Sequence, residues 1–364
     1  MTRAIPSRLP RWGWHACGLG VTVAAVISIM ALPPDPPPPV TVTPITTPQR
    51  PPTTLPGLLP DGTPYTPRYL LPNGTSLGEA LSPDGSALRL VERAATGAVR
   101  VLRHRPTAHT PQYVGFTRVG SEIVWAESHA GPEGGRTELW AVAPDTTTPP
   151  RRVTADTGDV VFVNSQYDIV AHGDRLYWLA VAGRAGHTEL RSVAVSGGAV
   201  TTHVVPGEWT LSAWPWLVSI GAAGPIRLRA VDTGREVTVQ AGPEELAACS
   251  PTWCRVLVSA PDGTTHLDVM RVDGSQRRRI GGDSAVAAVV DVALLDRFEV
   301  LTVDPSSTVA IDRPQLVVYD LATDRTITIA ERAHTVLTRD GLLWWSTGLS
   351  RESTWQVVDL RALR

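Results

Sequence analysis

The sequence contains no lysine and only three cysteines. All 33 basic residues among its 364 are arginines, and 35 acidic residues bring the formal net charge to −2. Proteins bind nucleic acids largely by placing positive charge against the phosphates, so this balance argues against nucleic acid as a partner. A structural zinc site needs four ligands, usually as two close cysteine pairs, and so few cysteines leave no second pair.

Short motifs that carry chemistry are also scarce. No H-E-x-x-H, P-loop or Asp-x-Asp calcium loop occurs, and nine histidines are scattered along the chain. One nucleophile-elbow pattern, G-x-S-x-G, occurs at residues 74–78, but its mechanism requires a strand–turn–helix in an α/β sheet, which nothing around it indicates. The sequence therefore predicts that the chain is no enzyme, and we expect no catalytic, cofactor-binding or metal-ligating residues.

One long uncharged run lies near the N-terminus, from residue 12 to residue 32, and Arg3, Arg8 and Arg11 precede it. A helix of about 20 residues spans the hydrocarbon core of a bilayer. The positive residues lie before the run, which predicts a cytoplasmic segment at 1–11 and a transmembrane signal-anchor helix at 12–32. The rest of the chain is then extracytoplasmic. A cleaved signal peptide, which would leave a secreted protein, is the alternative.

Proline and threonine dominate the next segment, residues 33–66. Such a composition cannot bury a core and favours the extended polyproline II conformation. We therefore expect a disordered linker here, with a folded domain at residues 67–364.

The region from residue 67 onwards holds no helical period over three turns. Short apolar or alternating runs such as "SALRLVE", "SEIVWAE" and "DRLYWLA" are separated by Gly, Asp, Pro and Ser. They recur about every 40 residues with material for four strands, which is typical of a β-propeller blade. The count predicts an all-β, seven-bladed propeller, with six blades as the alternative if the unit around Trp214 is miscounted.

The stretch "LSPDGSALRL", from Leu81 to Leu90, resembles the S-P-D-G repeat of TolB-like propellers. In that family a turn of this kind separates the first and second strands of a blade. The turns in "VDTGREVTV" and "YDLATDRTITI" resemble the connection from the third to the fourth strand. Only Ser82 to Gly85 match the motif well, so the resemblance implies the fold of a TolB-like propeller rather than an activity. The membrane anchor is predicted from residues 12–32, and the use of arginine alone as the basic residue points to a high-GC bacterium.

The ring also has to close, because an open strand exposes unpaired backbone groups. The last unit has material for only three strands, and we expect "PRYLLP", Pro67 to Pro72, to supply its outer fourth strand. The turns between first and second strands are predicted near Gly85, Gly120, Gly173, Pro215, Trp253, Asp296 and Gly341.

The stretch "CSPTWC" places Cys249 and Cys254 on either side of four residues. It aligns with "LSPDGS" at Leu81 to Ser86, so that the cysteines replace the residues that flank the turn. Flanking positions of a short hairpin lie opposite each other, at a separation that a disulfide can bridge. Outside the cytosol thiols tend to be oxidised, and we predict a Cys249–Cys254 disulfide rather than a metal or redox site.

Several loops between second and third strands are long and polar, and such loops emerge on one face of a propeller. They predict a binding face for a protein, peptide or cell-envelope ligand, presented by a membrane-tethered, monomeric and non-catalytic propeller. The alternative is an exported enzyme, such as a lyase, glycosidase or dehydrogenase, which requires polar groups from three or more blades to converge at one mouth of the channel. The candidate face comprises His129, Glu133, Arg136, Arg184, His187, Asp312, Arg313, Arg351 and Glu352.

Overall fold

A computed structural model describes residues 51–131, 134–220, 224–282, 284–304, 314–348 and 353–363. The predicted signal-anchor helix and most of the predicted linker lie outside these ranges. No helix within them is long and apolar enough to cross a membrane. They form strands and two short 3-10 helices, η1 (Thr107–His109) and η2 (Leu360–Ala362).

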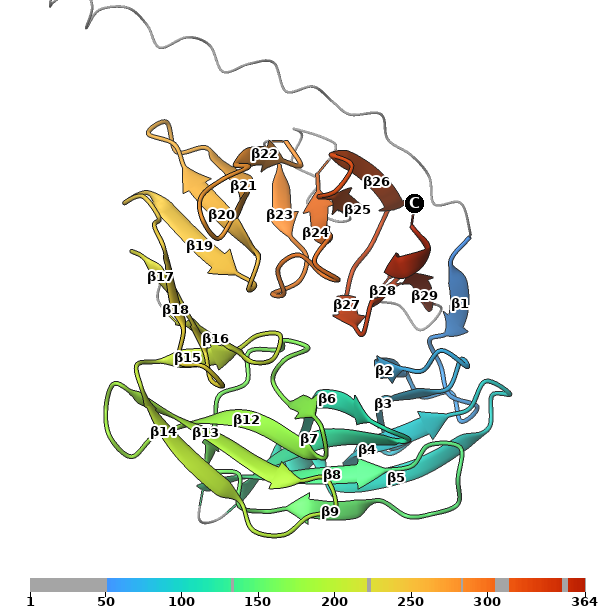
Figure 1. The fold of residues 1–364 in the computed structure, drawn as a ribbon. Coiled ribbons are helices and arrows are strands. Elements are labelled where there is room, and N and C mark those ends of the chain that lie inside the picture. The colour runs from blue at the N-terminus through green and yellow to red at the C-terminus, as the bar shows by residue number, and fades with distance from the viewer. Residues whose placement is uncertain are drawn as a thin grey trace, which may run out of the picture. The chain divides into compact units, whose positions relative to one another are not determined.

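Seven antiparallel sheets surround a central axis, which confirms the seven-bladed propeller and removes the six-bladed alternative (Figure 1). The first strand of each blade lies nearest the centre and the last lies at the rim (Figure 1).

Blade 1 consists of β2 (Thr66–Leu70), β3 (Ser76–Leu81), β4 (Ala87–Arg93) and β5 (Val99–Pro106). Blade 2 consists of β6 (Gln112–Val119), β7 (Glu122–Gly131), β8 (Gly134–Val142) and β9 (Arg151–Thr154). Blade 3 consists of β10 (Asp159–Val160), β11 (Val170–His172), β12 (Arg175–Val181), β13 (His187–Ala194) and β14 (Thr201–Pro206). Blade 4 consists of β15 (Trp209–Leu211), β16 (Trp216–Ser219), β17 (Ile226–Ala230) and β18 (Glu236–Val239). Blade 5 consists of β19 (Glu245–Cys249), β20 (Trp253–Ser259), β21 (Thr265–Arg271) and β22 (Arg278–Ile280). Blade 6 consists of β23 (Ala285–Ala287), β24 (Phe298–Val303), β25 (Gln315–Asp320) and β26 (Arg325–Ala330). Blade 7 consists of β27 (Val336–Arg339), β28 (Leu342–Ser346), β29 (Thr354–Asp359) and β1 (Thr53–Pro56).

The N-terminal part of the fold closes blade 7, but with a different strand from the one predicted. β1, with the sequence "TTLP", pairs antiparallel with β29, whereas "PRYL" enters blade 1 as part of β2. A rim strand needs only one hydrogen-bonding edge, which is why a proline-containing segment is tolerated there. The fold thus begins before residue 67, inside the range predicted as linker.

Two tryptophans of blade 7 form hydrogen bonds with the segment at the start of blade 1. The indole of Trp344 donates to the carbonyl of Pro67 at 3.0 Å, and that of Trp355 donates to the carbonyl of Tyr65 at 2.9 Å. Both rings are buried, so the two bonds join blade 7 to the start of blade 1 away from water.

The turns between first and second strands lie where predicted in six blades, and blade 1 is the exception. Gly85 joins β3 to β4, which are the second and third strands, because β2 precedes them. The stretches "LSPDGS" and "CSPTWC" therefore occupy different connections, and their alignment was wrong. The disulfide prediction is confirmed all the same, since Cys249 and Cys254 face each other across β19 and β20 and are bonded.

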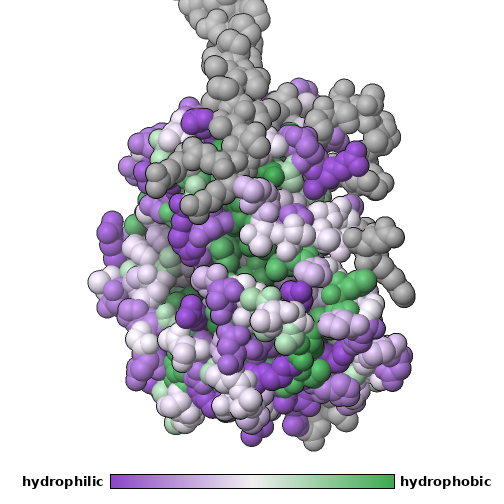
Figure 2. Space-filling model, turned by 90° about the vertical axis from the view of Figure 1, so that its right-hand side faces the viewer, coloured by the Kyte–Doolittle hydropathy of each residue, from purple (hydrophilic) through white to green (hydrophobic). Residues whose placement is uncertain are grey.

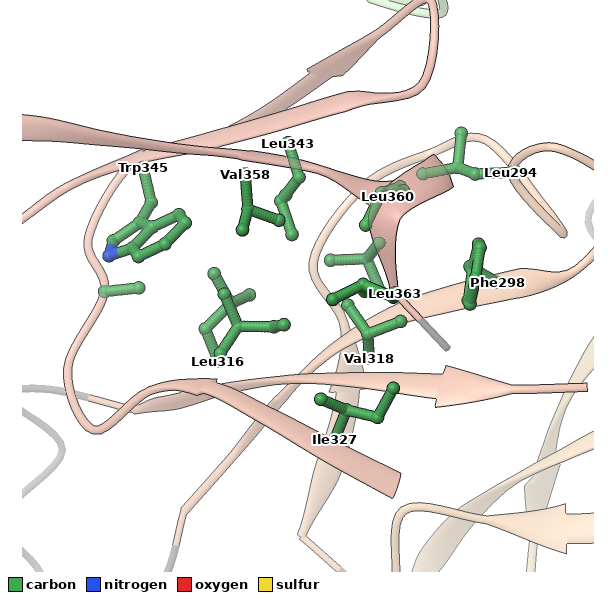
Figure 3. Packing of buried hydrophobic residues seen from close by; sticks show 13 residues of the cluster. Leu294, Phe298, Leu316, Val318, Ile327, Leu343, Trp345, Val358, Leu360 and Leu363 are labelled. Atoms are coloured by element: carbon green, nitrogen blue, oxygen red, sulfur yellow. The ribbon is translucent and has the colours of Figure 1, made fainter. Parts of the chain in front are cut away.

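The core consists of apolar layers between neighbouring blades. Between blades 6 and 7, Leu343, Trp345 and Val358 face Leu316 and Val318, all of them buried (Figure 3). Full burial of one such side chain contributes about 1.5–3 kcal/mol, so these layers carry most of the stability of the ring. Seen from the side, the outer surface is a mixture of hydrophilic residues and separate hydrophobic areas, as is normal for a folded domain (Figure 2).

Candidate functional site in the channel

The inner strand of blade 3 is interrupted. β10 and β11 both pair with β12, with Val160 opposite Ala180 and Val170 opposite Tyr177, so that residues 162–169 leave the sheet between them. We call residues 162–169 the channel segment, because it forms hydrogen bonds with residues of blades 6 and 7.

The long loop between β23 and β24 of blade 6 meets the channel segment. The hydroxyl of Ser165 donates to one carboxylate oxygen of Asp291 at 2.5 Å, and the backbone N–H of Gln166 donates to the other at 3.1 Å. Asp291 is only 8% exposed, and this burial raises the pKa of its carboxyl group.

Blade 7 holds the channel segment from another side. The guanidinium of Arg339 donates to the carbonyls of Phe116, Gln166 and Ser165, at 3.2 Å for Gln166 and 3.5 Å for Ser165. The next residue, Asp340, donates its N–H to the side chain of Gln166 at 3.3 Å and accepts a 2.5 Å hydrogen bond from the hydroxyl of Tyr69. Polar groups from blades 1, 2, 3, 6 and 7 thus meet in the channel.

Burial shifts the pKa values of Arg339 and Tyr69 in opposite directions, because it disfavours the charged form of each side chain. It lowers the pKa of the Arg339 guanidinium, against the attraction of nearby Asp291 and Asp340. It raises the pKa of the Tyr69 phenol, and the charge of Asp340 adds to that effect. The phenol therefore stays protonated and serves as a hydrogen-bond donor.

Asp168 lies within the channel segment and is 4% exposed. One of its carboxylate oxygens accepts a 2.9 Å hydrogen bond from the N–H of Val163, and the other is buried with no hydrogen-bond partner among the described residues. Burial raises the pKa of Asp168 to about 6, in spite of the hydrogen bond and the positive charge of Arg339. This carboxyl group can gain or lose a proton near neutral pH.

A buried ion pair fixes the loop that carries Asp291. The guanidinium of Arg255 is 2.9 Å from the carboxylate of Glu299 and donates to the carbonyls of Val289 and Val290 at 3.1 Å and of Asp291 at 3.3 Å. Arg255 is 7% exposed and Glu299 is fully buried. The loop is therefore held rigidly, which sets the position of the Asp291 carboxylate.

A cavity of about 240 Å³ opens beside the channel segment, between the inner strands of blades 3 to 6. Valine, leucine, isoleucine and alanine side chains form much of its wall, and Cys249 of the disulfide contributes to it. Its polar lining comprises Ser165, Tyr167, Thr210, Ser212, Ser219, Ser250 and Asp291.

The predicted binding face and the channel are separate places. His129 and Arg136 line another pocket, of about 550 Å³, whereas Arg184 lies in the connection between β12 and β13 and His187 is the first residue of β13. The described residues therefore do not bring the predicted set together into one site. Five members lie outside the described residues: Glu133, Asp312, Arg313, Arg351 and Glu352.

The G-x-S-x-G pattern is structural. Ser76 lies in β3 with no exposed surface, and its hydroxyl accepts a 2.9 Å hydrogen bond from Tyr65. No three His, Cys, Asp or Glu side chains gather to hold a metal ion in the part of the chain that the structure describes.

No protein-family model matches the sequence, and no curated protein matches it significantly. The fold is similar to a puromycin-hydrolyzing peptidase of Mycobacterium tuberculosis, with a TM-score of 0.54 and 14% identity over 88% of this chain and 55% of that one. It is also similar to an acylaminoacyl peptidase solved with Z-Gly-Gly-Phe-chloromethyl ketone, with a TM-score of 0.52 and 11% identity over 82% of this chain and 52% of that one. The chain spans about half the length of both peptidases.

A putative TolB from Agrobacterium tumefaciens is a weaker match, with a TM-score of 0.38 and 14% identity over 71% of this chain and 93% of that one. The seven-bladed propeller itself is shown by the order of the strands in the sheets, and the TolB-like repeat type stays a prediction.

The expectations of a non-catalytic scaffold and of no enzymatic role are corrected by these comparisons. Both solved structures named above with TM-scores over 0.5 are peptidases, which stands against the expected scaffold; at 14% and 11% identity they show the fold, and an enzymatic role for this chain is left to a proposal. The sequence analysis missed the channel residues because Ser165, Asp291 and Arg339 are far apart in the chain. The one available signal was the irregular stretch "NSQYDI" between two strand patterns of blade 3.

Proposed function

We propose that this chain is a peptidase-type propeller whose channel holds the peptide that is hydrolysed. The observation that carries the proposal is the convergence of polar groups from five blades beside a cavity in the channel. The likeness to peptidases supports the choice of peptides as the substrate class.

The chemistry that the channel offers is acid–base chemistry by carboxyl groups. Amide hydrolysis requires a proton to leave the attacking water and another to reach the departing amine, and groups that titrate near the working pH do this best. Asp168, with its pKa raised to about 6 and one unpartnered oxygen, fits this role. Asp291 is the second candidate, since it lines the cavity itself.

Hydrolysis of a panel of short fluorogenic peptides by the purified full chain tests this proposal. We expect turnover by the wild type and a loss of at least about a hundredfold in Asp168→Asn, because a general acid or base contributes about 10²–10⁴ in rate. An exposed carboxylate change, Asp262→Asn, serves as the matched control. Equal rates in all three proteins, or no hydrolysis by the wild type, would contradict the proposal.

The membrane anchor is part of the proposal. The basic residues before residues 12–32 support a single-pass protein with a cytoplasmic N-terminus, and a disulfide in the propeller fits an oxidising compartment outside the cytosol. A C-terminal reporter that is active only in the cytosol should then give no signal, whereas a strong signal would contradict this topology.

A further inference from the structure

One acidic side chain lines the cavity in the channel. Asp291 is the only charged residue of its described lining, and no ion pair reaches Asp291 among the described residues. The nearest arginines are otherwise engaged, since Arg339 donates to backbone carbonyls and Arg255 to carbonyls and Glu299. A carboxylate has about four acceptor positions, and the hydrogen bonds from Ser165 and Gln166 occupy two of them.

The remaining polar lining consists of hydroxyl groups, which can accept further hydrogen bonds. Thr210, Ser212 and Ser219 come from blade 4, whereas the hydroxyl of Ser250, in the turn between β19 and β20, already accepts from the N–H groups of Thr252 and Trp253. An ammonium group has three donors and no acceptor, so a carboxylate with neighbouring hydroxyls satisfies it. The Asp291 carboxylate would repel an anion, and a neutral guest would bring it no positive charge beyond the nearby charges of Arg339 and Arg255.

The walls of the cavity are apolar and exposed. Val163, Ile220 and Val290 are 40%, 49% and 49% exposed, respectively, and line it from blades 3, 4 and 6. Water against these walls is unfavourable, and an apolar body that covers them gains roughly 25 cal/mol for each Å² removed from water.

The size of the cavity limits what can enter. A cavity of about 150 Å³ holds one benzene molecule, so about 240 Å³ accommodates one apolar side chain together with a charged group. A whole folded partner, or several residues of a peptide, cannot be enclosed there.

We infer that this cavity is a binding site for a protonated amine on a small apolar body, with the Asp291 carboxylate as its counter-ion. Two sources share this chemistry: the free amino end of a short peptide with an apolar first residue, and the side chain of a lysine. The inference rests on the proposed function for its choice of peptide ligands, and it names the end of the peptide that the channel recognises.

Isothermal titration calorimetry with the purified full chain at pH 7 tests the inference directly. The first probes are n-pentylamine and 1-pentanol, which have similar apolar bodies and differ in charge. We expect n-pentylamine to bind at least about tenfold more tightly than 1-pentanol, a difference of about 1.4 kcal/mol. Equal affinities, or no binding of the amine, would overturn the site.

A second set of probes distinguishes the two sources. Leu-Gly-Gly with a free amino end, its N-acetylated form and N-acetyl-lysine amide are titrated in the same way. Tighter binding of Leu-Gly-Gly assigns the site to amino ends, and tighter binding of N-acetyl-lysine amide assigns it to lysine side chains. Equal binding of Leu-Gly-Gly and its acetylated form shows that the amine is not recognised and contradicts the inference.

Two variants keep the test independent of misfolding. Asp291→Asn removes the charge, and Ala248→Leu fills the cavity while leaving Asp291 in place; each should weaken n-pentylamine binding at least about tenfold. Asp262→Asn, which removes an equal charge from an exposed turn, should bind as the wild type does. Unchanged binding in Ala248→Leu, with an unchanged melting temperature, would place the amine elsewhere.

The result separates this inference from the proposed peptidase function. Amine binding without peptide hydrolysis retains the site and removes the peptidase activity. Hydrolysis that depends on Asp168 without amine binding retains the activity and removes the site.

Discussion

The inner strands of blades 5 and 3 differ in what they contribute. In blade 5, β19 pairs with β20 along its whole length and a short disulfide-bonded turn joins them. In blade 3, the inner strand is divided into β10 and β11, and residues 162–169 cross the channel. The regular strand maintains the ring, whereas the interrupted one brings Ser165 and Asp168 to its centre.

The difference shows how an irregular segment can stay ordered without a sheet. Its backbone groups need partners, and side chains supply them. Asp168 accepts from the N–H of Val163, Asp291 accepts from that of Gln166, and Arg339 donates to carbonyls of the same segment. Departures from a repeat are expected at functional sites, and the channel conforms to this rule.

The largest effect is expected from the buried ion pair that fixes the blade 6 loop. Arg255→Met leaves Glu299 buried without its partner and should lower the free energy of unfolding by about 3–5 kcal/mol. Arg229→Met breaks the more exposed pair with Glu236 in blade 4 and should cost at most about 1 kcal/mol. Urea unfolding of both variants checks the difference, and similar losses would contradict a special role for the loop.

The next effect is a pH dependence of opposite sign at a carboxyl group of the channel segment and at one in an exposed turn. The folded-state pKa of Asp168 is raised to about 6, so the stability it contributes is present below its unfolded pKa of 3.8 and is lost as the pH rises through 6. The loss is on the order of 3 kcal/mol, and Asp168→Asn should remove it. The hydrogen bond from the Ser82 hydroxyl and those from Ser86 lower the pKa of Asp84, in the exposed turn of blade 1, to about 2.

Asp84 should therefore behave in the reverse sense. It contributes stability above pH 3.8, and this contribution is lost as the pH falls through 2. Thermal unfolding of the wild type, Asp168→Asn and Asp84→Asn between pH 2 and pH 8 measures both signs. Parallel curves for the wild type and Asp168→Asn would show that the channel carboxyl is not buried as described.

A smaller effect is expected from the disulfide. For so short a loop the chain-entropy model gives about 2 kcal/mol, so the double change Cys249→Ser and Cys254→Ser should destabilise the ring by this amount without abolishing the fold. Denaturant unfolding of the oxidised wild type and the variant checks it. An unfolded variant would mean that the regular strand of blade 5 depends on the bond.

The smallest effect is expected from the loops that the sequence first indicated. His129→Ala and Arg136→Ala lie at the pocket between blades 2 and 3, away from the channel residues. Arg136→Ala should change the free energy of unfolding by no more than about 0.5 kcal/mol, as exposed substitutions usually do, and His129→Ala, at a half-buried position, by about 1 kcal/mol. Peptide hydrolysis should also be unchanged, and a strong loss of hydrolysis in either variant would move the site to this face.

The sequence was sufficient for features that depend on local pattern. The seven blades follow from the strand repeat, and the Cys249–Cys254 bond follows from a turn flanked by two cysteines. The closing strand was misplaced because Thr53–Pro56 has the composition of a linker and becomes a strand only by pairing with β29. Because β2 was assigned to blade 7 and not to blade 1, Gly85 was predicted to join the first and second strands of blade 1, whereas it joins the second and third.

The channel could not be predicted in the same way. Ser165 and Asp291 are 126 positions apart, and Gln166 and Arg339 are 173 apart. No local pattern encodes such pairs, because the ring brings them together only after all seven blades are in place. Burial, which gives Asp168 its raised pKa, likewise exists only in the folded ring.

Hydrogen exchange of the full chain, measured by mass spectrometry with and without Leu-Gly-Gly, tests most directly whether the channel is the functional site. We predict slower exchange in residues 162–169 and in the loop around Asp291, with no change in the connections near His129 and His187. Slower exchange at those connections, with the channel segment unchanged, would contradict the account.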